Sequence, residues 1–285
     1  MKLAIGIDTG GTYTDAVLYD FETKKILHAA KALTTKNDLC VGIGNALDAL
    51  PDEHFKEVRM LSLSTTLATN ACVEGKGGAA KLVFFNGDKG ILKKYGVEYG
   101  LPPVGEILVE PCRTDISGQI YAYPDWEKFE ADVRENCRGL DGIGVIELYS
   151  FKNGAVIEKE AKERIAKIAD IPVTCGYELF REPNSLQRGA GTLLNAGLYP
   201  VIEDFLRAVR RAMQKRGIDA PVVIMRSDGS LMTEEFARKH PVETLLCGPA
   251  ASVAGGYGLS REKNSVIVDM GGTTTDIAIV RGGVP

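Results

Sequence analysis

The sequence has few of the side chains that usually build metal centres and disulfide frameworks. It contains only three histidines, and its six cysteines are scattered from Cys40 to Cys247 without a C-x-x-C pair. The histidines show no ligand spacing, so a built-in zinc or di-iron centre is not expected. Widely spaced cysteines are typical of reduced thiols, which indicates a cytoplasmic protein.

A membrane span, a secretory leader and a basic stripe are also missing. No apolar run approaches the ~20 residues that cross a bilayer, and the chain enters a strand at Leu3 without a charged leader. The net charge is −4, so nucleic acid is not expected as the main partner. The remaining composition is that of a soluble globular protein, and 285 residues suffice for two domains or one large one.

The most informative feature is an eight-residue motif that occurs twice. Residues 8–15 read D-T-G-G-T-Y-T-D and residues 269–276 read D-M-G-G-T-T-T-D, so six of the eight positions are identical. Both copies stand between apolar runs, such as Leu3–Ile7 before the first and Ile277–Val280 after the second. An apolar run, a Gly-Gly turn and a second apolar run predict a β-hairpin with a tight connection.

The chemistry of this turn indicates phosphate binding. Glycines carry no Cβ, so their backbone N–H groups can approach a ligand closely, and threonine hydroxyls beside such a turn suit phosphate oxygens. Asp8 or Asp269, at the end of the leading strand, could hold a water or a metal ion near those phosphates. The alternative is an ordinary hairpin, since Asp and Gly are common turn residues. The duplication favours phosphate binding.

The rest of the first 85 residues predicts a mixed α/β sheet. A third strand over 25–33 follows the first hairpin, and Asn37 or Asp38 can cap a helix that runs to about Leu50. Strands follow over 58–63 and 81–85. A hairpin start in an α/β pattern favours a mixed rather than a purely parallel sheet.

The segment 64–78 lies directly after a strand end, where α/β proteins place their ligand sites. Thr65, Thr66, Thr69 and Asn70 offer neutral hydrogen-bond partners, so we expect them to bind a polar substrate. The alternative is a capped helix start followed by a glycine-rich turn.

The second half of the chain continues the α/β pattern. Residues 86–124 are rich in Gly and Pro and suggest an inserted subdomain, followed by strands over 142–148 and 172–175 with helices over 125–138 and 158–169. From Ser185 the chain is strongly helical, and Pro200 suits the first turn of a helix that stops at Gly217. The small residues of 247–256 predict a helix that packs closely against another backbone or whose N-terminus faces an anion.

These patterns divide the chain into four parts. We expect a first domain over 1–85 that carries the first phosphate loop, an inserted α/β subdomain over 86–180, a linking segment over 181–260, and the start of a second domain over 261–285 that carries the second loop. A complete second domain would need on the order of 100–200 further residues. The sequence therefore suggests a fragment of a longer polypeptide, in which both loops are present but the site between them is not closed.

The repeated motif resembles the two phosphate loops of the acetate and sugar kinase, heat-shock chaperone and actin superfamily, whose members clamp ATP between two ribonuclease-H-like domains. A closer resemblance is to the hydantoinase A and 5-oxoprolinase family. It rests on both loops, on S-T-T-L-A-T-N-A-x-x-E-G-K-G at 64–77, on Arg181-Glu182 and Asn195-Ala196, on M-R-S-D-G-S-L at 225–231, and on G-P-A-A-S-V-A-G-G at 248–256. At 153–158 the chain reads N-G-A-V-I-E, where many members carry N-P-x-H-E.

The resemblance implies an ATP-dependent enzyme that phosphorylates a carbonyl or amide oxygen of a small cyclic amide or ketone. Ring opening or carboxylation would follow, often with a B-type subunit performing the later step. Two alternatives remain open: a small-molecule kinase of the same superfamily, and a non-catalytic nucleotide-binding regulatory subunit.

The resemblance also implies roles for individual residues. Asp8 and Asp269 are expected to be catalytic and to hold Mg²⁺ through waters. The ATP phosphates would contact two sets of loop residues, Gly10, Gly11, Thr12 and Thr14 on one side, and Gly271, Gly272, Thr273 and Thr275 on the other. Arg181 and Glu182 would join the Thr65–Asn70 segment in binding the substrate.

Overall fold

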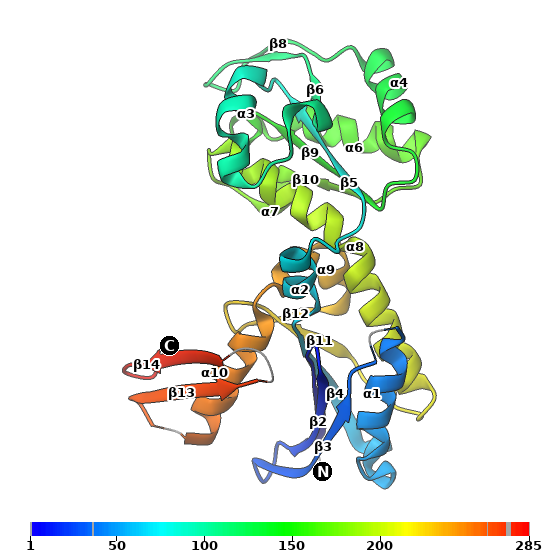
Figure 1. The fold of residues 1–285 in the computed structure, drawn as a ribbon, viewed down its shortest axis with the longest axis vertical. Helices are drawn as coiled ribbons and strands as arrows, with labels where there is room; N and C mark the ends of the chain where they lie inside the picture. The colour runs from blue at the N-terminus through cyan, green and yellow to red at the C-terminus, as the bar shows by residue number, and fades with distance from the viewer. Residues whose placement is uncertain (1, 36, 261, 272–274, 285) are drawn as a thin grey trace. The chain divides into compact units, whose positions relative to one another are not determined.

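The structure is a computed structural model that describes residues 2–35, 37–260, 262–271 and 275–284. The chain forms two compact units, the first from residues 1–75 and 201–285 and the second from residues 76–200 (Figure 1). Both units contain helices packed on a β-sheet, so the fold is mixed α/β, as the sequence predicted. Within the described ranges, no helix combines the length and the apolar character needed to cross a bilayer.

The first unit is built on a six-stranded sheet. Its strands are β1 (Leu3–Thr9), β2 (Tyr13–Asp20), β3 (Lys25–Leu33), β4 (Val58–Thr65), β11 (Val222–Met225) and β12 (Leu231–Thr233). Their spatial order is β12-β11-β4-β1-β2-β3. Strands β1, β2 and β3 form an antiparallel meander, whereas β4 runs parallel to β1 and to β11. The mixed sheet that the hairpin start predicted is therefore present.

Two helices lie on opposite sides of this sheet (Figure 1). Helix α1 (Leu39–Asp48) packs on β2 and β3, with Ile43 and Leu47 fully buried. Its N-cap is Asp38, whose carboxylate accepts a hydrogen bond from the backbone N–H of Cys40 at 3.0 Å. Helix α10 (Cys247–Ser260) lies on the other side and contacts β4 and β11.

The remaining elements of the first unit connect or extend this sheet. They are η1 (Asp52–Glu57), α2 (Leu67–Glu74), α9 (Glu234–Lys239), η4 (Pro241–Thr244), β13 (Ser265–Met270) and β14 (Thr275–Val280). Strands β13 and β14 form a separate two-stranded antiparallel sheet, which contacts α10.

The second unit contains a four-stranded parallel sheet with the order β10-β9-β5-β6. The strands are β5 (Ala80–Phe85), β6 (Leu108–Glu110), β9 (Gly142–Glu147) and β10 (Val173–Cys175). The helical segments are α3 (Lys89–Tyr95), η2 (Gly96–Tyr99), η3 (Val104–Glu106), α4 (Trp126–Asn136), α5 (Ser150–Asn153), α6 (Val156–Ile168) and α7 (Gly176–Leu179). A short hairpin of β7 (Arg113–Thr114) and β8 (Ile120–Ala122) completes it.

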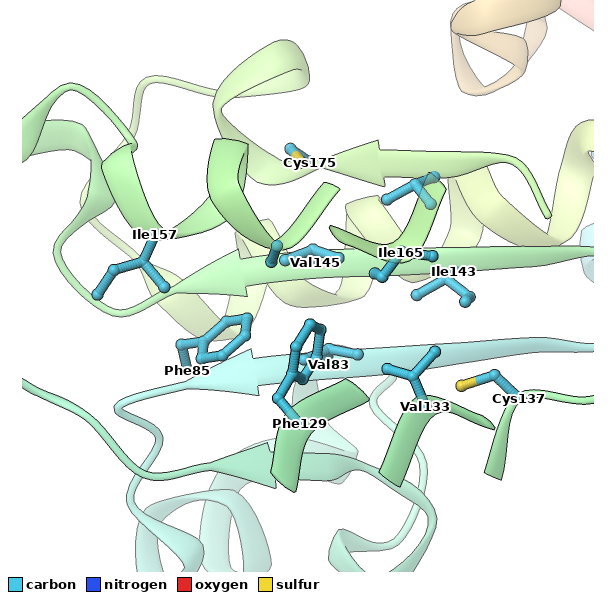
Figure 2. Close-up of a cluster of buried hydrophobic side chains, with 12 residues drawn as sticks. Val83, Phe85, Phe129, Val133, Cys137, Ile143, Val145, Ile157, Ile165 and Cys175 are labelled. Atoms are coloured by element: carbon cyan, nitrogen blue, oxygen red, sulfur yellow. The ribbon is translucent and has the colours of Figure 1, made fainter. Parts of the chain in front are cut away.

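Apolar side chains fill the space between this sheet and two of its helices (Figure 2). Phe85 on β5 packs against Phe129 on α4, with ring centroids 5.2 Å apart. Ile157 and Ile165 bring α6 onto the same cluster. A core of this kind stabilises the second unit because each large apolar side chain that leaves water contributes about 1.5–3 kcal/mol.

A buried charge network ties α6 to the C-terminal ends of the strands. Arg188 is 1% exposed and lies 3.6 Å from the Glu158 carboxylate. It also donates hydrogen bonds to Ser150 Oγ and to the carbonyl of Leu148, both at 2.8 Å. Burial raises the pKa of Glu158 and lowers that of Arg188. A buried pair of this kind requires its additional hydrogen bonds, because each charge has lost its hydration.

The division of the chain differs from the boundaries that the sequence suggested. Strand β5 was assigned to the first domain over 1–85, but it pairs with β9 and β6 in the sheet of the second unit. The second unit therefore runs over 76–200 rather than 86–180. An isolated apolar strand does not reveal its partners, because strand pairing depends on residues distant in sequence.

The expectation that Pro200 begins a helix was wrong. Pro200 lies inside α8 (Ser185–Gln214), a helix of 30 residues. Proline removes one helical N–H and crowds the preceding turn, yet α8 is continuous through Pro200. In the preceding turn, the carbonyl of Gly197 accepts a hydrogen bond from the N–H of Gly78 at 2.7 Å.

Candidate functional site

Both copies of the repeated motif form β-hairpins, as predicted. In the first, β1 and β2 pair so that Asp8 lies directly opposite Asp15. In the second, β13 and β14 pair so that Asp269 lies opposite Asp276. Each hairpin therefore carries two carboxylates side by side at the mouth of its turn. Like charges directly opposite each other on a sheet are destabilising, so this arrangement suits a bound cation.

The two hairpins border one cleft in the first unit, with a volume of about 700 Å³. The first hairpin contributes Asp8, Gly10, Gly11, Thr12, Tyr13 and Asp15, and the second contributes Asp269, Met270, Gly271 and Asp276. The other lining residues are Lys31, Thr66, Asn70, Glu74, Gly248, Pro249 and Ser252. Loops separated by more than 250 residues in the sequence thus face the same space.

Asp8 is the half-buried carboxylate of this cleft. Its Oδ1 accepts a hydrogen bond from Ser64 Oγ at 2.6 Å. Burial raises the pKa of Asp8 above its usual value, the Ser64 hydrogen bond opposes this shift, and the charges of Asp15 and Asp269 raise the pKa further. Asp269 has a matching partner, because Ser252 Oγ donates to its Oδ2. Each leading aspartate is therefore oriented by a serine hydroxyl.

The first loop presents backbone donors to the cleft. The N–H of Gly10 is used within the turn, where it donates to the carbonyl of Tyr13 at 2.9 Å. For Gly11 and Thr12, the described part of the chain provides no acceptor to the backbone N–H groups. A Cβ added to Gly11 would lie 3.4 Å from Asn70 Nδ2. The backbone N–H groups of Gly11 and Thr12 can therefore donate to an anion. A side chain at residue 11 would narrow the space through which the anion reaches them.

Helix α10 has features that bear on both interpretations that the sequence left open. Gly248 and Pro249, in its first turn, line the cleft, where the partial positive charge of a helix N-terminus favours an anion. Further along, a Cβ on Gly256 would lie 2.8 Å from Ile267 Cγ2, so the helix also packs closely against β13.

The donor set of the cleft fits Mg²⁺. This ion prefers oxygen ligands, keeps several waters, and is usually held by one or two carboxylates together with substrate phosphates. Asp8, Asp15, Asp269 and Asp276 supply such carboxylates around one space. Among the described residues, no three His, Cys, Asp or Glu side chains form a ready-made metal cage.

Several predicted ligand residues are engaged inside the protein instead of facing the cleft. The Thr14 hydroxyl is fully buried and lies 3.0 Å from Thr34 Oγ1. Thr65 Oγ1 donates to the carbonyl of Thr9 at 3.0 Å and accepts from the N–H of Leu67. Thr69 Oγ1 accepts from the N–H of Leu246 at 3.2 Å. These hydroxyls hold α2 and its neighbours in place.

The other predicted residues fall into three groups. Thr66 and Asn70 line the cleft, and Asn70 Nδ2 donates to Thr66 Oγ1 at 3.2 Å. Arg181 and Glu182 belong to the second unit, where the Arg181 N–H donates to the Glu182 carboxylate. Thr275 begins β14 and is exposed, whereas Gly272 and Thr273 lie outside the described residues.

Several cleft residues were not singled out from the sequence, among them Asp15, Asp276, Lys31 and Ser252. Asp15 and Asp276 close the two motif copies, and the equal spacing of each motif already implied that its two aspartates would pair across the hairpin. Lys31 forms an ion pair with Asp15 at 2.7 Å, and Ser252 orients Asp269. Neither Lys31 nor Ser252 has a local sequence signal, since each depends on a contact between distant segments.

Comparison with known proteins agrees with the resemblance seen in the sequence. The hydantoinase/oxoprolinase N-terminal region matches residues 4–169, and hydantoinase/oxoprolinase matches residues 188–285. The caprolactamase subunit alpha of Pseudomonas jessenii is 27% identical over 98% of this chain and 43% of its own length. This chain spans 42–44% of the length of the first curated relatives it matches, and 25–27% of the length of the 5-oxoprolinases.

Two solved structures share the fold. Nucleotide-free acetone carboxylase, studied for ATP-dependent acetone carboxylation, superposes with a TM-score of 0.79 at 22% identity, over 98% of this chain and 44% of that one. The ATP-dependent caprolactamase of Pseudomonas jessenii superposes with a TM-score of 0.77 at 25% identity, over 97% and 43%. Together with the family matches, which cover most of the sequence, these findings show that the chain belongs to the hydantoinase/oxoprolinase family.

Proposed function

We propose that this chain carries the nucleotide clamp of an ATP-dependent enzyme that phosphorylates the carbonyl or amide oxygen of a small cyclic amide or ketone. Phosphorylation makes the carbonyl carbon electrophilic, so that ring opening or carboxylation can follow. The ATP dependence of the caprolactamase and acetone carboxylase relatives supports this proposal. The chain would act as the A-type subunit beside a B-type partner, as the subunit naming of caprolactamase suggests.

One observation carries the proposal: the two copies of D-x-G-G-T-x-T-D face a single cleft. A lone glycine-rich hairpin is a common turn, whereas two such turns around one space match the needs of a triphosphate. The strand order β3-β2-β1-β4-β11, with an antiparallel meander followed by parallel strands, supports a ribonuclease-H-like first clamp domain. In this proposal β13 and β14 begin a second, related clamp domain, from about residue 261.

The chain's own groups have distinct tasks in this mechanism. The N–H groups of Gly11 and Thr12 donate to phosphate oxygens from one side, and the loop at Gly271 approaches from the other. Ser64 and Ser252 fix the carboxylates of Asp8 and Asp269, which would hold Mg²⁺ through waters. The metal would neutralise charge on the phosphates. Asp8, as the more buried carboxylate, would also orient the attacking carbonyl oxygen. Such positioning and charge neutralisation account for much of phosphoryl transfer.

The test compares the two leading aspartates with an exposed control. In the intact protein, Asp8→Ala and Asp269→Ala should each lower carbonyl-stimulated ATP turnover by roughly 100-fold or more, because both remove charge that acts in the transition state. The control Asp204→Ala alters a side chain that is 73% exposed on α8, and it should leave turnover unchanged. Phosphate release and Mg-ATP affinity are measured for all three variants.

The products separate this function from its alternatives. Release of inorganic phosphate that depends on the carbonyl compound supports the proposal. Accumulation of a stable phospho-ester would instead identify a small-molecule kinase. Nucleotide binding without any turnover would identify a regulatory subunit. Unchanged turnover and Mg-ATP affinity in both aspartate variants would exclude the clamp itself.

A further inference from the structure

A second cavity lies beside Asp8, on the face of the six-stranded sheet that carries α10. Its volume is about 280 Å³, smaller than that of the cleft. Asp8 and Asp15 line both spaces, so the two meet at these carboxylates. Helix α10 borders the cleft through Gly248 and Pro249, and borders the cavity through Ala251.

The strand register explains why this part of the sheet is hollow. Gly6 pairs with Val17 on one side and with Ser62 on the other, and all three residues line the cavity. The next row on the same face contains Asp15, Asp8 and Ser64. A Cβ added to Gly6 would lie only 3.1 Å from Val17 Cγ2. The cavity therefore extends down to the sheet at this point, because residue 6 is glycine and residue 62 is the small residue serine.

The second hairpin shows what happens without that glycine. By the motif alignment, Gly6, Asp8, Asp15 and Val17 correspond to Ile267, Asp269, Asp276 and Ala278. All four of these also line a cavity, but its volume is only about 130 Å³. The bulky Ile267 occupies the position of Gly6, and it lies against Gly256 of α10. The two hairpins thus carry aspartates at equivalent positions, but the cavity beside the aspartates of the first hairpin has the larger volume.

The walls of the 280 Å³ cavity beside the first hairpin combine apolar surface with negative charge. Val17, Met225 and Ala251 supply apolar atoms, and the only charged lining residues in this described part of the chain are Asp8 and Asp15. Lys31 pairs with Asp15 but lines the larger cleft instead. No cationic side chain of the described residues lines this cavity. A ligand that placed a carboxylate here would therefore lose the hydration of that charge without gaining a partner for it.

We propose that this cavity holds the apolar body of the carbonyl substrate and that it selects small, uncharged lactams or ketones over substrates bearing a carboxylate. This inference rests on the proposed function. The carbonyl group would point toward Asp8, where the cavity joins the cleft, and the hydrocarbon part would lie between Gly6, Met225 and Ala251. A cavity of this size is at the lower end of the ~300–1,000 Å³ typical of small-molecule sites, which suits a single ring.

A matched pair of ligands tests the charge selection. 2-Pyrrolidinone and 5-oxoproline share one ring and differ by a carboxylate. In the intact protein with its partner subunit, 2-pyrrolidinone should stimulate ATP turnover with a kcat/KM higher by roughly tenfold or more, because the carboxylate of 5-oxoproline would be buried in this cavity without a cationic partner. Equal values, or a preference for 5-oxoproline, would overturn the charge selection.

Paired substitutions on α10 test the location. Ala251→Leu fills the cavity, whereas Ala254→Leu adds the same atoms at an exposed position of the same helix. Ala251→Leu should raise KM for 2-pyrrolidinone by roughly 10–100-fold more than it changes KM for ATP, as expected when a pocket loses space. Ala254→Leu should change neither KM. Equal effects of the two variants would overturn the assignment of the cavity and leave the proposed function intact.

A variant that enlarges the cavity provides a gain-of-function test. Met225→Ala should raise the ratio of kcat/KM for ε-caprolactam to that for 2-pyrrolidinone by roughly tenfold, since one or more methylenes of space are added. An unchanged ratio in a variant whose thermal unfolding is normal would contradict the assignment. If no neutral carbonyl compound stimulates ATP turnover in the unaltered protein, the proposed function fails, and this inference fails with it.

Discussion

The two hairpins have nearly the same motif but opposite surroundings. On the first, Ile5 is fully buried and Ile7 is 3% exposed. The corresponding residues of the second, Val266 and Val268, are 64% and 54% exposed. Yet both turns reach the same cleft with the same pair of carboxylates. The motif itself therefore determines the hairpin and its carboxylates, whereas burial of the apolar face depends on the elements around it.

Those surrounding elements are visible at the first hairpin. Strand β3 pairs with β2, and α1 packs across both. In the described part of the chain, β13 and β14 form a two-stranded sheet, whose contacts with α10 involve the other face, at Ile267. Two-stranded hairpins alone are marginally stable in water. We therefore expect the first hairpin to contribute most to stability and the second to contribute chiefly to the cleft.

The largest expected difference concerns stability. Ile5→Ala should lower the free energy of unfolding by about 2–5 kcal/mol, because a buried large side chain leaves a cavity when truncated. The matched Val266→Ala should change it by no more than about 0.5 kcal/mol, as is usual for exposed positions. Urea denaturation of both variants provides the measurement. A similar loss in both would mean that the apolar face of β13–β14 is covered.

A smaller difference between the hairpins is expected for the effect that the charges of Asp8 and Asp269 have on the free energy of unfolding. Burial raises the pKa of Asp8 in the folded protein, so the folded state binds protons more readily than the unfolded state, and ionisation of Asp8 destabilises the fold. This destabilisation is absent below the unfolded pKa, develops as the pH rises through the folded pKa, and is complete above it.

Asp8→Asn should therefore stabilise the protein at pH 7, by roughly 0.5–2 kcal/mol, the range usual for substitutions that relieve a functional site. The gain should disappear as the pH falls below about 4, where the carboxyl of unfolded Asp is protonated. Asp269→Asn, at an exposed position, should have little effect on stability. Thermal unfolding at several pH values checks both variants, and an Asp8→Asn gain that persisted at low pH would refute the role of the charge.

Local patterns in the sequence were sufficient for much of the fold. Both hairpins, the Asp38 cap of α1 and the alternation of strands and helices could be predicted, because turn residues, capping residues and apolar periodicity act over a few residues. The membership of β5 in the second sheet and the passage of α8 through Pro200 could not. The first depends on pairing with strands distant in the sequence, such as β9, and the second runs against the usual effect of proline on a helix.

The residues of the candidate site could also be predicted only in part from local patterns in the sequence. The glycine turns and leading aspartates follow from the repeated motif, but a threonine in a motif can serve either a ligand or the fold. Thr65 and Thr69 are close to Cys247 and Leu246 through hydrogen bonds that span more than 170 residues. Burial raises the pKa of the Cys247 thiol to about 11, so this group is a packing partner and not a nucleophile. No short-range signal distinguishes such contacts from ligand binding.

The most direct test of the shared cleft is a double-mutant cycle on Mg-ATP affinity with Asp8→Asn and Asp269→Asn. If both hairpins bind one nucleotide, each single variant removes much of the same interaction, so the loss of binding free energy in the double variant should be smaller than the sum of the two single losses by at least ~1 kcal/mol. Strictly additive losses in Mg-ATP affinity would contradict the account, because they would show that the two hairpins act independently.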